Sequence, residues 1–207
     1  DRFVESPKLS GAITLGLQLS SRDLDALPGD LSGDPGPRYV PGAVWCRCDP
    51  VPVSQPLLVL AHPEILSEVG LRADDERVER LVAGELMPSG AAPAAFNYCG
   101  HQFGSFARQL GDGAAVSLGV AETAGGRLEL QLKGVGPTPL CREGLTGKKS
   151  LAALTAEFIQ SEALHRLAIP TVRAAAVVAG RDAGGSDVGA MLRVGRSLLR
   201  FGTLELA

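Results

Sequence analysis

The sequence predicts an α+β fold: an antiparallel sheet with one packed helix, preceded by an extended arm. Three observations support it. Residues 28–56 are rich in Pro and Gly, residues 128–133 alternate apolar and polar side chains, and residues 150–167 repeat apolar residues at helical spacing. We therefore expect an N-terminal arm over residues 1–56 and a sheet-and-helix domain over residues 57–207.

The arm is predicted to be extended because it contains several prolines, including the run Gly-Asp-Pro-Gly-Pro at 33–37. Each proline fixes φ and removes a backbone donor, which disfavours a helix. After the arm, Pro63 lies near an expected helix start within residues 59–69. Residues 73–83 predict a second helix, charged and exposed.

A β-hairpin is predicted next. Residues 114–120 form a short apolar run, Gly125 and Gly126 make a turn, and residues 128–133 alternate cleanly. The alternation places the leucines on one face of the second strand. The other face carries Glu129, Gln131 and Lys133.

The following helix is expected from Ser150 to Leu167, with Ser150 as its N-cap and Pro170 beyond its end. Two further strands, residues 172–179 and 189–194, are joined by a polar turn. The last residues, 200–207, are predicted to begin another strand.

Composition excludes several classes of protein. The net charge is −3, with 20 basic and 23 acidic residues, so the basic footprint of a nucleic-acid-binding protein is absent. No stretch approaches the roughly 18 apolar residues of a membrane span. The four cysteines lack the spacing of a zinc site and are expected to be reduced thiols. Residues 1–8 mix charges of both signs and lack the features of a secretory or transit leader.

Two candidate phosphate contacts lie around the predicted hairpin. Gly111 and Gly113 flank Asp112 just before the first strand, and glycines expose backbone N–H groups to phosphate oxygens. An ordinary turn between strands is the alternative. Lys133 ends the alternating strand on its polar face and suits a phosphate contact, although a solvated surface lysine fits the same pattern.

Two further groups are candidates. Glu157 and Glu162 both lie on the predicted helix, and either could orient the strand lysine or simply face solvent. Three arginines, Arg193, Arg196 and Arg200, occupy one short apolar segment. Their planar guanidinium groups suit phosphate oxygens, and exposed arginines at a sheet edge are the alternative.

Taken in order, the motifs resemble the selenoprotein O family. They are Asn97-Tyr-Cys-Gly-His-Gln-Phe-Gly104, Gln109-Leu-Gly-Asp-Gly113, Leu130-Gln-Leu-Lys-Gly-Val-Gly-Pro-Thr-Pro139, Glu157-Phe-Ile-Gln-Ser-Glu-Ala163, Ile169-Pro-Thr171 and Arg200-Phe-Gly202. The resemblance implies a protein-kinase-like N-lobe that binds ATP in a flipped orientation. It also implies transfer of AMP, with Mg²⁺, to Ser, Thr or Tyr hydroxyls of protein substrates.

By matching motif positions, the resemblance implies that Lys133 is the nucleotide-binding lysine and Glu157 its helix partner. It assigns glycine-loop contacts to Gly111 and Gly113, and phosphate contacts to Arg193 and Arg200. Gly147 corresponds to the glycine of the family's Asp-Gly-Arg loop. That loop reads Leu145-Thr-Gly-Lys148 here, so its aspartate is replaced.

The resemblance places the catalytic aspartate and the metal ligands in a C-terminal lobe beyond these residues. The chain is then expected to be the nucleotide-binding part of a protein adenylyltransferase, inactive alone. The alternative is a truncated, non-catalytic binding or regulatory module. Likeness to the animal members implies a mitochondrial location, and a cytoplasmic one is the alternative. Neither nucleic acid nor membrane is an expected partner.

Overall fold

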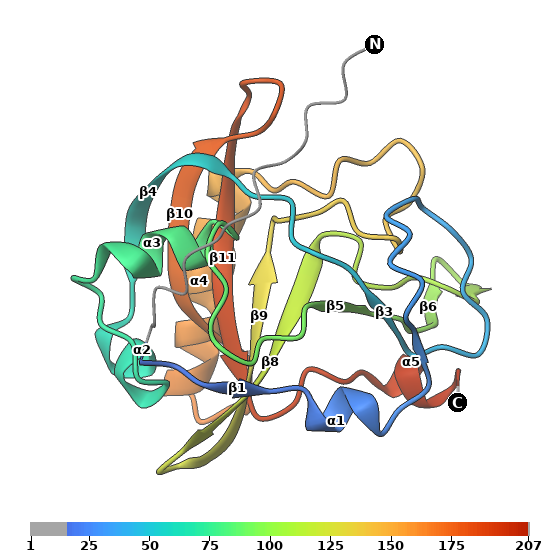
Figure 1. Ribbon diagram of the computed structural model, residues 1–207, viewed down its shortest axis with the longest axis horizontal. Helices are drawn as coiled ribbons and strands as arrows, with labels where there is room; N and C mark the ends of the chain where they lie inside the picture. The colour runs from blue at the N-terminus through green and yellow to red at the C-terminus, as the bar shows by residue number, and fades with distance from the viewer. Residues whose placement is uncertain (1–15, 207) are drawn as a thin grey trace.

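The computed structural model describes residues 16–206 and shows an α+β fold with a large mixed sheet and few helices (Figure 1). Within these residues the sheet has nine strands, in the order β2-β3-β5-β8-β9-β11-β10-β4, with β1 paired to β8. Their bounds are β1 Leu19–Ser20, β2 Gly29–Asp30, β3 Trp45–Arg47, β4 Ser54–Ala61, β5 Ala94–Phe96, β8 Ala115–Thr123, β9 Gly126–Lys133, β10 Arg173–Arg181 and β11 Asp187–Gly195.

The two predicted hairpins are confirmed and form the centre of the sheet. Strands β8 and β9 pair antiparallel, as do β10 and β11, and β9 also pairs with β11. Leu130 and Leu132 are fully buried, as the alternation predicts. Gln131, on the opposite and supposedly polar face, is buried as well, because residues from neighbouring loops cover that face near the end of the strand.

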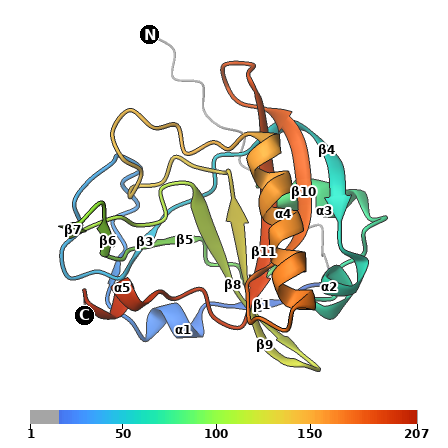
Figure 2. The same cartoon turned by 180° about the vertical axis from the view of Figure 1, so that it is seen from behind.

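Helices cover both faces of the sheet, whereas the sequence predicted only one packed helix (Figures 1 and 2). Helix α4 (Leu151–Arg166) lies against β10 and β11 on one face. Helices α2 (Pro63–Glu68) and α3 (Glu76–Val82) lie on the other. The expectation that the second of these is exposed was wrong, because its apolar residues Val78, Leu81 and Val82 are fully buried in the core.

Helix α4 begins as predicted. The hydroxyl of Ser150 accepts a hydrogen bond from the backbone N–H of Ala153 at 3.3 Å, which caps the first turn. Leu154 is fully buried against β10 and β11. Ile159 and Leu167, which share another face of the helix, are exposed.

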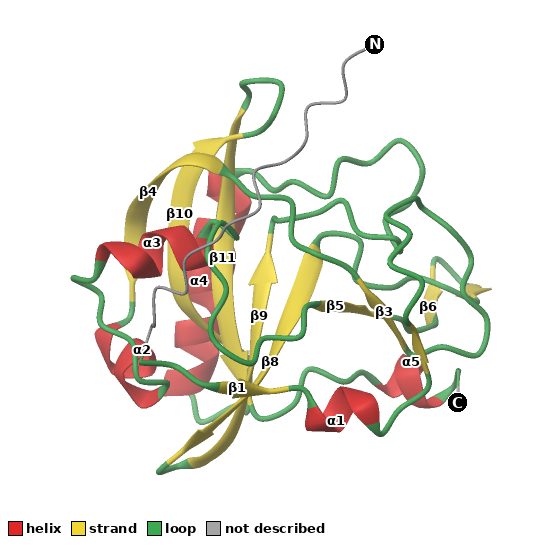
Figure 3. Cartoon of the chain, viewed as in Figure 1, coloured by secondary structure: helices red, strands yellow, loops and turns green. Residues whose placement is uncertain are grey.

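The Pro/Gly-rich segment is extended and contributes strands to the same sheet. Strands β2 and β3 pair parallel. Strand β3 pairs antiparallel with β5, and Figure 3 shows these two strands side by side. The sheet is therefore mixed, where the sequence predicted a purely antiparallel one. The division of the chain at residue 56 stays a prediction.

The predicted C-terminal strand is wrong. Residues Phe201–Leu204 form the single helical turn α5, in which the N–H of Thr203 donates to Arg200 O at 2.9 Å. The N–H of Cys99 donates to Gly202 O at 3.1 Å, so this turn is held against the 97–99 segment and not against a strand edge. A Cβ at Gly202 would lie 2.0 Å from Cys99 O, so only glycine allows this approach.

Three smaller features complete the described chain. Helix α1 spans Arg22–Asp25, and strands β6 (Gly100–Gln102) and β7 (Ser105–Ala107) form a separate hairpin.

All four cysteines are free thiols. Among residues 16–206, no helix is both long enough and apolar enough to cross a bilayer. The residues predicted to lack a leader sequence, 1–8, lie outside the described part.

Candidate functional site

A cleft of about 530 Å³ lies where β9 and β11 meet the glycine-containing loops. Six of the seven residues that the sequence singled out line it. These are Gly111, Gly113, Lys133, Gly147, Arg193 and Arg200. The seventh, Glu157, reaches the cleft through its contacts with two of them.

Lys133 and Glu157 form an ion pair between strand β9 and helix α4. Residue spacing left open whether Glu157 or Glu162 would face this lysine, and the family resemblance implied Glu157. The structure pairs Lys133 with Glu157. Burial lowers the pKa of Lys133, and Arg193 acts in the same direction, while the bond to Glu157 opposes both. Burial alone would raise the pKa of Glu157, but its bonds to Lys133 and Arg193 outweigh that effect and hold the pKa below its ordinary value. The glutamate is therefore ionised and fixes two cations.

Arg193 lies beside this pair on strand β11. Its Nη1 donates to Glu157 Oε1 at 3.2 Å, and its Nη2 donates to the side-chain oxygen of Gln131. Its Nε is buried and has no hydrogen-bond partner among the described residues. A bound anion could accept from this free donor, since a buried N–H without a partner is costly.

Arg200 also lines the cleft and lies at the N-terminal end of α5. Its Nη2 lies 3.5 Å from Asp112 Oδ1, and its guanidinium stacks over the ring of Tyr98 at 4.6 Å. Asp112 also accepts hydrogen bonds from the Tyr98 hydroxyl at 3.2 Å and from Gln131 Nε2 at 2.9 Å. Burial and the neighbouring Asp112 carboxylate raise the pKa of Tyr98 to about 12, so its hydroxyl keeps its proton.

The glycines shape the cleft by packing against each other. A Cβ on Gly147 would lie 2.7 Å from Gly136 Cα and 2.8 Å from Gly113 O. A Cβ on Gly136 would lie 2.5 Å from Gly113 O. Three loops thus meet backbone to backbone, and any side chain at these positions would push them apart.

Two residues considered from the sequence lie elsewhere. Glu162 pairs with Arg173 at 2.5 Å and with Arg166 at 2.9 Å, on a part of α4 away from Lys133. Arg196 lines a separate pocket of about 440 Å³, together with His165 and Arg173. Neither contributes to the main cleft.

Sequence reasoning missed several residues of the cleft as individual contributors. They are Tyr98, Asp112, Gln131, Lys148 and Lys149, four of which line it directly. Tyr98, Asp112 and Gln131 belong to the motifs quoted above, so their positions were visible. Their burial and mutual contacts were not, because these depend on loops distant in sequence.

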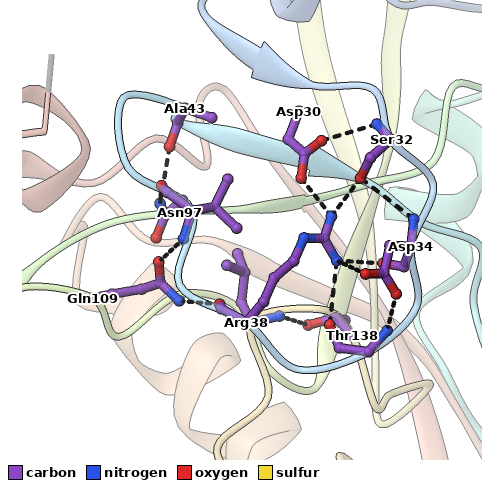
Figure 4. Close-up of polar contacts among 11 residues, drawn as sticks. Asp30, Ser32, Asp34, Arg38, Ala43, Asn97, Gln109 and Thr138 are labelled. Atoms are coloured by element: carbon purple, nitrogen blue, oxygen red, sulfur yellow. Dashed lines mark hydrogen bonds and ion pairs between the residues drawn. The ribbon is translucent and has the colours of Figure 1, made fainter.

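The Pro/Gly-rich segment supports the cleft from outside (Figure 4). Figure 4 shows Arg38 among Asp30, Ser32 and Asp34, whose oxygens hold its guanidinium. The backbone N–H of Arg38 donates to Pro139 O at 3.0 Å.

Two buried or half-buried amides extend this support. Gln109 donates to Arg38 O at 2.7 Å and accepts from Val40 N at 2.9 Å, and Asn97 donates to Ala43 O at 2.9 Å (Figure 4). Thr138, next to Pro139, donates to Asp112 O at 2.8 Å. The segment is therefore tied to the loop that contains the cleft's glycines.

The donor set fits a polyphosphate and does not fit a metal ion. Six cationic side chains line the cleft: Lys133, Arg142, Lys148, Lys149, Arg193 and Arg200. The only carboxylate among the lining residues is Asp112, which is already engaged by three partners. Within the described residues no group of three or more His, Cys, Asp or Glu side chains could hold a metal. The side chains that line the cleft thus suit a polyphosphate, and within residues 16–206 no cluster of metal-ligating side chains lies beside them.

Comparison with known proteins decides the family. A family profile described as protein adenylyltransferase SelO matches residues 43–207. The chain belongs to the SelO family. Residues 43–207 include every one of the cleft residues named above.

Two relatives illustrate the membership. The human protein adenylyltransferase SelO, mitochondrial, is 42% identical over 214 residues, which cover 92% of this chain and 32% of the relative. The protein nucleotidyltransferase YdiU of Xanthomonas campestris (strain 8004) is 42% identical over 205 residues, which cover 92% of this chain and 39% of the relative. This SelO-family chain therefore spans between about a third and two fifths of the length of these relatives.

Proposed function

We propose that this chain is the nucleotide-binding part of a protein adenylyltransferase that transfers AMP from ATP to Ser, Thr or Tyr hydroxyls of proteins. One observation carries the proposal. Lys133, Arg193 and Arg200 converge on a single cleft in a chain of the SelO family. We further propose that the sheet and α4 correspond to a protein-kinase-like N-lobe, because Lys133 and Glu157 pair as the strand lysine and helix glutamate of kinases do.

The chemistry agrees with the charges in the cleft. Attack of a hydroxyl on the α-phosphorus breaks its bond to the β-phosphate, so pyrophosphate leaves with the added negative charge. Positive groups are needed where that charge develops. In this proposal Arg193 and Arg200 hold phosphate oxygens, Lys133 is oriented by Glu157, and the packed glycines let backbone approach the phosphates. Mg²⁺ would neutralise phosphate charge, with ligands supplied from outside the described residues.

The nucleotide assignment predicts that Lys133→Ala weakens ATP binding by at least about tenfold, since a charge-assisted contact of 1.5–3 kcal/mol is lost. Isothermal calorimetry of this chain with ATP measures it. Arg72→Ala is a matched control, because Arg72 forms an exposed ion pair with Asp74 on the surface. Unchanged ATP affinity in Lys133→Ala would remove this lysine from the site.

We expect the 207 residues alone to transfer no AMP. The carboxylate that lines the cleft, Asp112, is held by Arg200, Tyr98 and Gln131, and this leaves it unsuited to act as a base or metal ligand. Incubation with ATP, Mg²⁺ and a protein mixture, followed by mass spectrometry, checks this. A mass increase corresponding to AMP on any Ser, Thr or Tyr would refute the expectation and show that these residues suffice.

We propose a mitochondrial location for this chain, because the human and mouse relatives are both named mitochondrial. The Xanthomonas relative is bacterial and equally similar, at 42% identity, so a cytoplasmic location is the alternative. Imaging of the tagged protein in its own cells tests it, and a diffuse cytoplasmic signal would contradict it.

A further inference from the structure

Asp112 is the most enclosed charged side chain of the cleft. It lies between the glycines of the Gly111-Asp112-Gly113 loop and is only 5% exposed. Arg200, Tyr98 and Gln131 all contact its carboxylate, at 3.5, 3.2 and 2.9 Å respectively. Burying a carboxylate is unfavourable unless it is paired and hydrogen-bonded, so this arrangement requires all three partners.

Arg200 needs an anchor, because its side chain is 49% exposed and lies in a segment without strand pairing. A free arginine side chain samples many rotamers, and ordering it on binding costs free energy. Here the carboxylate of Asp112 holds one edge of the guanidinium, and the ring of Tyr98 supports its face. Held in this way, Arg200 lines the cleft.

Gln131 connects the same carboxylate to the second arginine. Its Nε2 donates to Asp112 Oδ2, and its Oε1 accepts from Arg193 Nη2. Since an amide has one donor end and one acceptor end, this orientation satisfies both neighbours. Gln131 is 1% exposed, so neither contact can be replaced by water.

We propose that Asp112 is a positioning residue that holds Arg200 directly, and Arg193 through Gln131, in the geometry that receives the phosphates of ATP. This inference rests on the proposed nucleotide-binding function. The proposal predicts that removing the negative charge of Asp112 weakens ATP binding, the opposite of what simple repulsion predicts. A carboxylate repels phosphate, so charge alone would make its removal improve ATP binding, whereas a positioning role makes removal weaken it.

The first experiment measures ATP and adenosine binding by calorimetry for the wild type, Asp112→Asn, Arg200→Ala and the double variant. We expect Asp112→Asn to weaken ATP binding about tenfold, because Arg200 is then no longer held in place and has to be ordered when ATP binds. Adenosine binding should not change, since adenosine has no phosphates. In the Arg200→Ala background the Asp112→Asn change should alter ATP binding less than about twofold, because the two residues act as one unit. Asp74→Asn, which breaks an exposed ion pair, is the matched control.

Either of two results overturns the proposal. Tighter ATP binding by Asp112→Asn would show that electrostatic repulsion dominates, and unchanged binding would show that Asp112 does not position the arginines. Full additivity of Asp112→Asn and Arg200→Ala would show that Asp112 acts independently of the arginine.

A second experiment needs neither ATP nor a folded Asp112 variant. Burial raises the pKa of Asp112, and the Arg200 guanidinium opposes that rise. In Arg200→Ala, loss of the guanidinium should therefore raise this pKa further, read from the ¹³C carboxyl resonance of Asp112. The Nε–H signal of Arg200 in the wild type should show restricted motion. An unshifted Asp112 resonance or a freely mobile Arg200 overturns the anchoring. Absence of ATP binding by the wild type, with the anchoring intact, would instead count against the proposed function.

Discussion

At the scale of single residues, Lys133 and Lys148 show how neighbours distinguish two lysines that line one cleft. Lys133 has a carboxylate partner in Glu157. Within the described part of the chain Lys148 donates to carbonyl oxygens, that of Val51 at 2.7 Å among them. Burial without a close counter-charge lowers the pKa of Lys148 to about 8. We therefore expect Lys148 to be partly neutral, and so nucleophilic, near pH 8.

This predicts that Lys148 reacts with an acylating reagent with a midpoint near pH 8 in the folded chain and near pH 10.4 in urea. Between about pH 8 and pH 10.4, Lys148 is protonated in the unfolded chain and largely deprotonated in the folded one. The contribution of Lys148 to the free energy of unfolding therefore rises with pH across this window. Competitive labelling read by mass spectrometry measures the midpoint, and Lys148→Arg identifies the peptide. A folded-state midpoint above pH 10 would contradict the prediction.

How much of the site the sequence predicts depends on whether a residue's role is local. Lys133 could be assigned because alternation in its own strand places it on the polar face beside two glycines. Periodicity alone could not choose between Glu157 and Glu162, since that choice depends on how α4 sits on the sheet. Only the family resemblance pointed to Glu157. Asp112 was missed because its burial arises from Tyr98, Gln131 and Arg200, which come from three separate segments.

At the scale of elements, the cleft depends on three glycine loops that pack backbone to backbone. Gly147 has φ +65 and no room for a Cβ. Gly144, in the same loop, has φ +77, yet a Cβ there would meet nothing within 4 Å. The two positions share a left-handed backbone and differ only in packing. Substitutions there therefore separate the cost of backbone strain from the cost of a steric clash.

We expect Gly144→Ala to lower the free energy of unfolding by about 1 kcal/mol, the cost of a left-handed alanine. Gly147→Ala should lower it by about 3 kcal/mol, because the Cβ also displaces Gly136 and Gly113. Urea denaturation of the two variants measures the difference. Equal destabilisation would mean that the loops separate easily and that the close packing is unimportant.

Elements with strong local patterns were predicted well, and elements held by distant contacts were not. Helix α4 and the β8–β9 and β10–β11 hairpins follow from period and turn residues. Strand β2 is only two residues long, too short for an alternation of apolar and polar residues to be visible in the sequence. It is recognised only by its pairing with β3. The turn α5 was misread as a strand because its Phe-Gly-Thr-Leu sequence carries no helical signal, and Cys99 holds it in place.

At the scale of the whole molecule, charge is distributed unevenly. The chain carries a net charge of −3, yet six cationic side chains and one carboxylate line the cleft. An anionic ligand is therefore attracted to one place on a protein that otherwise repels it.

This predicts that ATP affinity falls by about fivefold or more between 50 and 300 mM KCl, because the Debye length shortens from roughly 14 to 6 Å. Calorimetry at several salt concentrations measures the slope. Adenosine, measured in parallel, should be insensitive to salt. A flat salt dependence for ATP would show that the cationic side chains do not contact its phosphates.

The hydrogen bonds that Arg38 forms with distant residues have a consequence for the order in which the chain folds. Contacts such as Gln109 to Arg38 and Arg38 to Pro139 join residues 71 or more positions apart. Closing such long loops costs conformational entropy, whereas the β8–β9 and β10–β11 hairpins close only short loops. The β8–β9 and β10–β11 hairpins should therefore fold early. The segment around Arg38 and the loops that it contacts at Gln109 and Pro139 should be the last to become protected from hydrogen exchange.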